Sequence, residues 1–572
     1  MTATPLLRVS NLSVHFDRSA RPAVAEVNFE VAAGECLAIV GESGSGKSVT
    51  ARSLLGLAPA GAHVSFNELS LAGESLPAPG ARRWRTIRGA SIGLVLQDAL
   101  VSLDPLRPVG REIDDVLRLH TTLSQRERQA RVLELLDAVG IPDPVLRARQ
   151  RSGELSGGLR QRALIAAGIA AGPALIIADE PTTALDVTVQ ARVLELLSSL
   201  RNNGTAMILI THDLAVVSRV ADRVAVMSEG RIVETGETNA LLRAPTTLPT
   251  QQLLAAIPVD VPRGVPLTLP ADTKPDLRTV VEASPEPVAV AAPVAGAVSA
   301  VAVSTHATTT ASAGSAAPPA LELRSVSRRY PTPHGASIQA LDAVSLSLTA
   351  GTTLGLVGQS GSGKTTIARI ALGLETADSG EVLLAGHEWG SLSARERRPL
   401  RPTLGAIYQD ALSSFDPRLS VERILNDALS ARASDTRRSL TTTAELLDAV
   451  GLPPALKNRR PLHLSGGQRQ RVAIARALAP GPQTILCDEP VSSLDVSTQA
   501  RVLNLLDELQ RHLHLSYLFI SHDLGVIRHM SDRVAVITEG RIVETGETDE
   551  IFTNPRHPYT QSLLSALPRV RG

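Results

Sequence analysis

Residues 41–48 read Gly-Glu-Ser-Gly-Ser-Gly-Lys-Ser, and residues 358–365 read Gly-Gln-Ser-Gly-Ser-Gly-Lys-Thr. Both follow the pattern G-x-x-x-x-G-K-[ST], in which backbone N–H groups of a glycine-rich loop surround nucleotide phosphates. An apolar run precedes each loop and a helical stretch follows it, so the sequence predicts a strand, a phosphate loop and a helix, twice. The runs are Leu37–Val40 and Leu354–Val357, and the helices are Ser48–Leu57 and Thr365–Leu374. The predicted loop residues are Gly41, Glu42, Ser43, Gly44, Ser45, Gly46, Lys47, Ser48, Gly358, Gln359, Ser360, Gly361, Ser362, Gly363, Lys364 and Thr365.

The repeat extends far beyond the loops. Asp222–Thr238 reads DRVAVMSEGRIVETGET, and Asp532–Thr548 reads DRVAVITEGRIVETGET, so only two positions differ. A repeat of this length, present in two copies, indicates two domains of one fold rather than a solenoid of short units.

A change of composition separates the two copies. Residues 259–320 are rich in Ala, Val, Pro, Thr and Ser and cannot bury enough apolar surface to fold alone. As a flexible coil this linker would span roughly 40–50 Å and let the two domains pack face to face. We therefore expect a first domain at 1–258, a linker at 259–320, a second domain at 321–550 and a tail at 551–572.

Composition excludes several classes of protein. The 57 basic and 57 acidic residues cancel, so no basic field favours a nucleic-acid partner. Cys36 and Cys487 lie in apolar runs and are predicted to be buried, which leaves neither a disulfide framework nor a cysteine metal cluster and favours the reducing cytosol. The first ten residues do not resemble a signal peptide, and the prolines of Pro287–Val303 favour a linker over a membrane span.

Acidic side chains follow a second buried strand in each copy. In the first copy, Ala174–Ala178 ends at Asp179 and Glu180, and a third strand, Met207–Ile210, ends near His212. Polar groups at the carboxyl ends of buried strands indicate an open α/β sheet that binds its ligand at that edge. Asp179 and the loop hydroxyl Ser48 are predicted to hold Mg²⁺, and Glu180 to activate the attacking water. The equivalents in the second copy are Thr484–Cys487, Asp488, Glu489, Tyr517–Ile520, His522 and Thr365.

A second anion cradle is predicted in each copy. A Leu-Ser-Gly-Gly segment precedes a helix rich in Arg, Ala and Ile, and a serine with two glycines at a helix start can bind an anion. One nucleotide does not need two cradles, so a head-to-tail pair, in which each copy completes the site of the other, explains the excess. The predicted cradle residues are Ser156, Gly157, Gly158, Ser465, Gly466, Gly467 and Gln468.

Together these motifs resemble those of the ATP-binding cassette (ABC) ATPases, over the whole chain outside the linker. The resemblance implies two ATP molecules, with Mg²⁺, sandwiched between two α/β cassettes that each have a parallel-sheet core and a helical subdomain. It implies that two glutamines sense the γ-phosphate and belong to the metal site, that two histidines hold the γ-phosphate and water, that two aspartates link the sites, and that two aromatic residues stack on adenine. These residues are Gln97, Gln409, His212, His522, Asp186, Asp495, Phe16 and Tyr330.

The two expected sites differ at one position of their cradles. Site one would combine Lys47 with the cradle at Ser465, and site two would combine Lys364 with the cradle at Ser156. The first cradle continues with Leu159 where the second has Gln468, which removes a polar side chain beside site two. We therefore expect two hydrolysing sites of unequal rate.

Two further segments resemble the importer ATPases for oligopeptides, dipeptides, glutathione and nickel. Residues 97–105 and 409–418 are similar to their Q-D-x-x-x-S-L-[ND]-P segment, and the tail Asn554–Thr560 is similar to their C-terminal motif. The first copy keeps only a remnant of this tail, with Leu248 and Pro249 where the second has Pro558 and Tyr559. The resemblance implies two integral-membrane permease subunits, an extracytoplasmic substrate-binding protein, and a peripheral position on the cytoplasmic face of the membrane.

Other functions fit less well. Ribosome-associated factors with two cassettes should have a long, basic, helical linker, whereas this linker holds only three basic residues and many prolines. DNA-repair ATPases would need cysteine sets for zinc, which two cysteines cannot supply. Two arginine clusters, Arg82–Arg88 and Arg395–Arg401, are left as either a solvated face or a contact with membrane partner or lipid.

Overall fold

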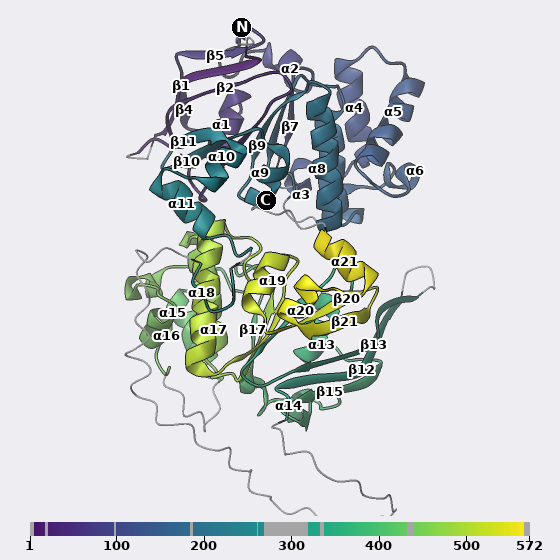
Figure 1. Cartoon of the computed structure of the whole chain (residues 1–572), viewed down its shortest axis with the longest axis vertical. Helices are drawn as coiled ribbons and strands as arrows, with labels where there is room; N and C mark the ends of the chain where they lie inside the picture. Colours follow the sequence, from purple (N-terminus) through teal and green to yellow (C-terminus); the bar gives the residue numbers. More distant parts are fainter. Residues whose placement is uncertain are drawn as a thin grey trace, which may run out of the picture.

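The computed structural model describes residues 5–17, 21–96, 99–182, 187–259, 261–267, 318–331, 337–431 and 440–565. Within these ranges the chain forms two halves of one design, the first above the second in Figure 1. Most of the predicted linker, including Pro287–Val303, lies outside the described residues.

Each half is built around a six-stranded sheet. In the first half its strands are β3 (Cys36–Gly41), β7 (Ile92–Val95), β8 (Leu175–Asp179), β9 (Ala206–Ile210), β10 (Arg223–Ser228) and β11 (Arg231–Glu237). In the second half they are β14 (Thr353–Val357), β17 (Leu404–Ile407), β18 (Thr484–Asp488), β19 (Ser516–Ile520), β20 (Arg533–Thr538) and β21 (Arg541–Glu547). The orders β11-β10-β3-β9-β8-β7 and β21-β20-β14-β19-β18-β17 are equivalent, and only β11 and β21 pair antiparallel. The predicted α/β class and the predicted duplication are therefore confirmed.

A smaller antiparallel sheet covers one side of each half. Its order is β2-β1-β5-β6 in the first half, with β4 on β1, and β13-β12-β15-β16 in the second. The strands are β1 (Leu7–Phe16), β2 (Val24–Val31), β4 (Ala62–Ser65), β5 (Glu68–Leu71), β6 (Glu74–Ser75), β12 (Leu321–Pro331), β13 (Ser337–Leu348), β15 (Ser379–Leu384) and β16 (His387–Glu388). In the first half, one buried cluster joins this sheet to α1 (Lys47–Leu54) and to Leu37 and Ile39 of β3. Neighbouring β3 residues face the opposite cluster, as the two-residue period of a strand requires.

Helices cover the remaining surfaces. In the first half they are α2 (Trp84–Ile87), α3 (Ala99–Ser102), α4 (Val109–His120), α5 (Gln125–Ala138), α6 (Pro144–Arg147), α7 (Gly157–Ile169), α8 (Val187–Asn202), α9 (Leu214–Val220), α10 (Thr238–Arg243) and α11 (Leu248–Ala255). In the second half they are α13 (Lys364–Ala371), α14 (Ala394–Arg397), α15 (Val421–Leu429), α16 (Thr443–Ala449), α17 (Gly466–Leu478), α18 (Val496–Leu513), α19 (Leu524–Met530), α20 (Thr548–Thr553) and α21 (Pro558–Ser565). Short 3₁₀ turns lie at Ser152–Glu154, Arg401–Thr403, Pro454–Asn458 and Pro461–His463. No helix in these ranges has both the length and the apolar character needed to cross a bilayer.

One arginine of each cluster has a structural role that neither prediction included, whereas the others are exposed and stay compatible with a solvated face or a partner contact. Arg88 donates to the carbonyl oxygens of Leu55 and Gly56 at 2.9 and 3.0 Å, just after α1 ends. Arg397 donates to Gly373 at the end of α13 at 2.7 Å and is buried. Each of these two arginines therefore satisfies carbonyls that a helix end leaves without a partner.

The two cysteines are buried, as predicted. Cys36 and Cys487 are free and fully buried in β3 and β18, and burial raises the pKa of both thiols. Thiols in this state act as small hydrophobic side chains.

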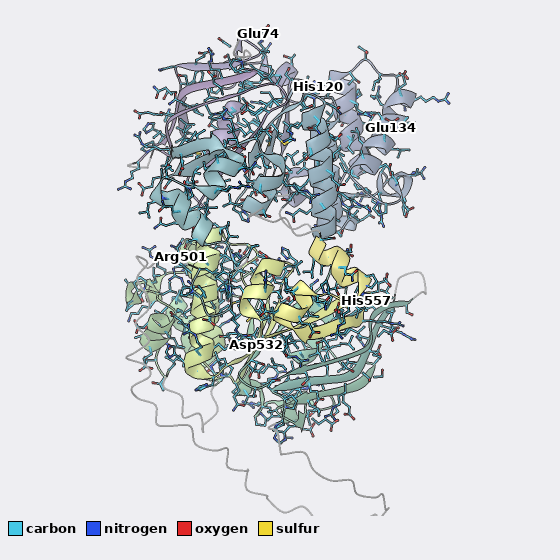
Figure 2. All side chains as sticks on the ribbon, viewed as in Figure 1. Glu74, His120, Glu134, Arg501, Asp532 and His557 are labelled. Atoms are coloured by element: carbon cyan, nitrogen blue, oxygen red, sulfur yellow. The ribbon has the colours of Figure 1, made fainter. Side chains whose placement is uncertain are left out.

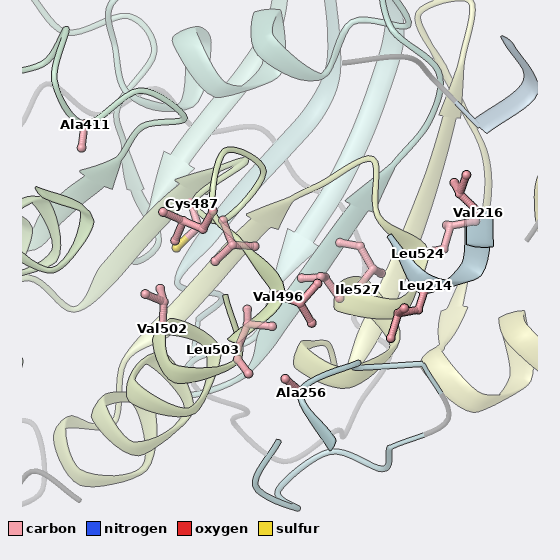
Figure 3. Packing of buried hydrophobic residues seen from close by; sticks show 14 of the residues in the cluster. Leu214, Val216, Ala256, Ala411, Cys487, Val496, Val502, Leu503, Leu524 and Ile527 are labelled. Atoms are coloured by element: carbon pink, nitrogen blue, oxygen red, sulfur yellow. The ribbon is translucent and has the colours of Figure 1, made fainter. Parts of the chain in front are cut away.

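Apolar packing joins the two halves. One buried cluster contains residues of both, and Figure 3 shows Leu214 and Val216 of α9 beside Leu524 of α19. Ala256, just after α11, packs toward α18 of the second half in the same view. The contact is approximately symmetric, since Leu214 and Leu524 are equivalent positions of the repeat.

A strap from the first half lies on the second half. It comprises residues 257–259 and 261–267, of which 259 onward was expected to be flexible linker. Arg263 forms an ion pair with Asp532, which Figure 2 labels, and donates to Gln510 at 2.6 Å, and Leu267 is 1% exposed. These paired and buried groups give the strap a fixed place that its composition did not indicate.

We predict that Arg263→Ala weakens the association of the two halves about tenfold. A hydrogen bond to a charged group contributes about 1.5–3 kcal/mol, and about 1.4 kcal/mol is a factor of ten in affinity. The halves would be co-expressed as two chains divided within 268–317, and their dissociation constant measured. Arg219→Ala, which breaks an ion pair with Glu195 inside the first half, is the control. Equal affinities for Arg263→Ala and wild type would show that the Arg263 contacts do not help to hold the two halves together.

Candidate functional site

The phosphate loops connect β3 to α1 and β14 to α13. Lys47 Nζ donates to the carbonyl oxygens of Gly41 and Glu42 at 2.8 and 2.7 Å. Lys364 Nζ donates to the equivalent carbonyls of its own loop, both at 2.7 Å. Gly46 has φ 102°, and a Cβ there would lie 2.5 Å from the Ala23 carbonyl oxygen, so only glycine fits.

A cavity opens over each loop. The cavity over the first loop has a volume of about 480 Å³ and the one over the second about 320 Å³. The second is lined by residues of its own half, among them Lys364, Thr365, Gln409, Glu489 and His522. Each cavity thus brings together a predicted phosphate loop, catalytic glutamate and histidine.

The residues predicted to hold a metal converge at the loop. Ser48 Oγ donates to Asp179 Oδ1 at 3.1 Å, which joins the start of α1 to the end of β8. Burial raises the pKa of Asp179 and that of Asp488. A hydroxyl beside a buried carboxylate fits Mg²⁺, which prefers oxygen ligands and would compensate the buried charge. No cluster of three or more His, Cys, Asp or Glu side chains with metal-site geometry occurs in the described part of the chain.

Each glutamate that was predicted to be catalytic is held in an unusual conformation. Glu180 and Glu489 both have φ 49°, a left-handed conformation that is costly for a residue with a side chain. Their N–H groups donate to Ile210 and Ile520 of the next strand, at 2.8 and 2.9 Å. Glu229 and Glu539 share this conformation, so it is the place of Glu180 and Glu489 on the two cavities, together with the strain, that fits a functional role for these carboxylates.

A histidine is paired with each glutamate. The contacts are 3.0 Å between His212 Nδ1 and Glu180 Oε1, and 3.1 Å between His522 Nδ1 and Glu489 Oε1. Burial lowers the pKa of both histidines, but hydrogen bonding and charge from the glutamates outweigh it, so each pKa is raised above 6.5. Burial likewise raises the pKa of Glu489, but His522, helped by the charge of Lys364 and a hydrogen bond from Ser492, outweighs this effect, so the pKa is lowered.

We predict that Glu489→Gln lowers the pKa of His522 below 6.5, because only burial would then remain as the dominant cause. In wild type the folded pKa exceeds the unfolded one, so this histidine stabilises the fold below pH 6.5 and loses that contribution as pH rises through the folded pKa. NMR titration of histidine-labelled protein, assigned with His522→Gln, measures the change. An unaltered His522 midpoint in Glu489→Gln would contradict the prediction, and His212 serves as the internal reference.

The cavity over the first loop has walls from both halves. Ser492, Ser493, Leu494 and Asp495 of the second half face the loop of the first. Burial lowers the pKa of Lys47, and the negative charges of Glu180, Asp495 and Asp179 act against that. Asp495 was predicted to communicate between the sites, whereas the three residues before it were not singled out. The sequence could have indicated these three residues, because they directly precede that aspartate in the Ser-Ser-Leu-Asp segment.

A third cavity lies between the halves. It has a volume of about 170 Å³ and is lined by matching residues of the repeat. His212 and Asp213 line it from the first half, and His522 and Asp523 from the second. Burial raises the pKa of Asp523, and the charge of Asp213 raises it further. The two histidine-bearing loops therefore meet at the boundary between the halves.

The cradle serines begin their helices as predicted. Ser156 Oγ accepts from Leu159 N at 3.4 Å, and Ser465 Oγ accepts from Gln468 N at 3.3 Å. The Gln468 side chain also accepts from Ser465 N at 3.1 Å, a reciprocal cap that Leu159 cannot form.

Among the described residues, no cradle residue lines either nucleotide cavity. This differs from the prediction that the cradle of each half completes the site of the other. A Cβ on Gly466 would lie 3.6 Å from Leu494, so the second cradle sits directly behind the segment that does line the first cavity.

Of the eight residues that the family resemblance implied, four lie outside both cavities or outside the described chain. Gln97 and Asp186 lie outside the described residues, while Gln409 lines both cavities. Phe16 ends β1 and Tyr330 lies near the end of β12. The Tyr330 hydroxyl donates to Glu375 at 2.9 Å, and the Arg328 guanidinium lies 5.2 Å from its ring centroid. Adenine stacking by these two rings stays a prediction.

Comparison with known proteins agrees with this site. The profile of the ABC transporter family matches residues 24–183 and 341–492, and that of the oligopeptide/dipeptide transporter C-terminal region matches 543–572. The oligopeptide transport ATP-binding protein OppD of Mycobacterium tuberculosis is 40% identical, over 99% of this chain and 99% of its own length.

Two further relatives are of similar length. The peptidoglycan transport ATP-binding protein YejF of Agrobacterium fabrum is 40% identical over 98% of this chain and 96% of its own length. The glutathione import ATP-binding protein GsiA of Shigella flexneri is 39% identical over 99% of this chain and 90% of its own length. With two cassettes that each carry an ATP-binding loop and a carboxylate pair, the chain belongs to the ABC transporter family and is a tandem ABC ATPase.

Proposed function

We propose that this chain is the ATP-hydrolysing subunit that drives an importer of di- or oligopeptides. The observation that carries the proposal is the pairing of two ABC cassettes with an oligopeptide/dipeptide-type C-terminal region at 543–572. The full-length relatives named for oligopeptide, peptidoglycan and glutathione transport support the same class. Two integral-membrane permeases and an extracytoplasmic binding protein would complete the system, with this chain peripheral on the cytoplasmic face.

The two nucleotide sites are proposed to lie between the halves. Support comes from the cavity over the first loop, where residues 492–495 of the second half face Lys47. The cradle at Ser465 lies just behind this segment, so a small closure would bring it to the nucleotide of site one, and the cradle at Ser156 would serve site two. ATP would then hold the halves together, and hydrolysis would release them.

Each residue of the site has its own role in the proposed hydrolysis of ATP. Lys47 exchanges its two loop carbonyls for phosphate oxygens, and the backbone N–H groups of the loop hold the remaining charge. Glu180 accepts a proton from the attacking water, and His212 orients the γ-phosphate. Ser48 and Asp179 would hold Mg²⁺, whose chemistry is to neutralise phosphate charge. Lys364, Glu489, His522, Thr365 and Asp488 have the same roles in the second site.

Affinity capture of this chain from gently solubilised native membranes tests the proposal. Two permease subunits together with an extracytoplasmic binding protein are the expected partners, and the ligand carried by that binding protein would name the substrate. Recovery of ribosomal proteins without a permease would refute the transport role and favour a translation factor. Glutathione or nickel on the binding protein would keep the importer and refute only the peptide substrate.

A further inference from the structure

The C-terminal motif is anchored in the same way in both halves. In the second half, Glu544 of β21 accepts from the backbone N–H groups of Arg556 and His557, at 2.7 and 3.1 Å, in the turn before α21. Figure 2 labels His557 in this turn. In the first half, Glu234 of β11 accepts from the N–H groups of Thr246 and Thr247, at 2.8 and 3.1 Å, before α11. The scaffold of the tail is therefore duplicated.

The last helix of each half, α11 or α21, carries a different side chain at its second position. In α21 this position is Tyr559, whose hydroxyl accepts from the N–H of Gln359 at 3.0 Å. Gln359 is the second residue of the second phosphate loop. In α11 the equivalent position is Pro249, which has no hydroxyl to offer to the first loop.

The hydroxyl and the loop lysine act on the two sides of one peptide group. The peptide between Gly358 and Gln359 presents its carbonyl to Lys364 Nζ at 2.7 Å and its N–H to Tyr559 Oη. When Lys364 turns toward phosphate, it no longer donates a hydrogen bond to this carbonyl. The tyrosine contact does not involve the lysine, so it can keep the peptide plane oriented through that exchange.

We infer that Tyr559 is a positioning residue of the second nucleotide site: its hydroxyl fixes the orientation of the phosphate loop and couples the C-terminal helix α21 to ATP binding there. The first site lacks this coupling because Pro249 occupies the equivalent position. The inference concerns the nucleotide affinity of this chain alone, so it holds whichever substrate the permeases carry.

Tyr559→Phe tests this, because it removes one hydroxyl and leaves the ring in place. The full-length variant is titrated with photoreactive azido-ATP, and mass spectrometry of the peptides assigns the label to each half. A net hydrogen bond contributes about 0.5–1.5 kcal/mol, so we expect about 2- to 10-fold weaker labelling affinity in the second half. Labelling of the first half, measured in the same molecules, should keep its wild-type affinity.

Tyr517→Phe is the matched control. Tyr517 also lies in the second half, is fully buried, and its hydroxyl donates to the Leu506 carbonyl at 3.0 Å, away from the loop. It should lower the midpoint of thermal unfolding without changing either affinity. The inference is overturned if Tyr559→Phe leaves the second-half affinity unchanged, or if it weakens both halves equally.

Discussion

ATP turnover by the double variant Glu180→Gln, Glu489→Gln is expected to be about 10²–10⁴-fold below that of wild type, the usual contribution of a general base. Glutamine has nearly the shape of glutamate but cannot accept a proton from water. Both positions combine a left-handed backbone with a histidine contact, so the two carboxylates are held in the same way. Steady-state phosphate release by the purified chain measures the loss, and retained ATP binding shows that the loops remain intact.

A matched control exists in the same chain. Glu229 and Glu539 also have positive φ, 47° and 48°, and occupy equivalent turns after β10 and β20. Their double replacement by glutamine makes the same chemical change on the same backbone outside the nucleotide cavities. Turnover should stay near wild type, and a comparable loss in this control would show that the effect is not specific to the catalytic pair.

The two single variants are expected to differ. In the proposed head-to-tail arrangement, Gln468 caps the cradle helix of site one reciprocally, whereas Leu159 leaves the cradle helix of site two with one side-chain cap bond fewer. A less ordered cradle lowers the rate of site two, so Glu489→Gln should cost less activity than Glu180→Gln. Identical losses would argue against inequality, and Leu159→Gln should raise the rate that remains in Glu180→Gln.

The strands that carry the site could be predicted because burial and chemistry agree there. A parallel strand covered on both faces reads as a continuous apolar run, and the three runs predicted in each copy end at a glycine loop, an Asp-Glu pair or a His-Asp pair. The repeat then doubled each of these signals. The antiparallel sheets were not predicted, because their alternating pattern, as in β2, is short and carries no chemistry to mark it.

Contacts between distant segments could not be predicted in the same way. Arg263 lies in a stretch whose composition indicates a flexible linker, and its ion pair with Asp532 and its hydrogen bond to Gln510 give it a fixed place. The hydroxyl of Tyr559 meets a loop two hundred residues earlier (559 − 359), and no local pattern records that distance. Local sequence indicates which groups can bind phosphate, whereas the folded chain decides which residues position them.

A crossed pair of variants tests which cradle serves which loop, and its effect is expected to be as large as that of the glutamates. If the halves complete each other, Lys47→Ala and Ser465→Arg both damage site one, while Lys47→Ala and Ser156→Arg damage both sites. The first combination should therefore keep the turnover of Lys47→Ala alone, and the second should fall at least about 10²-fold further, as expected when charge-stabilising donors are lost. Both serines cap a helix through the same contact, so the two arginine changes cost similar stability. The opposite pattern, with Ser465→Arg abolishing the activity left in Lys47→Ala, would mean that each half uses its own cradle. The residues 492–495 that face Lys47 would then close the first cavity without bringing the second cradle to it.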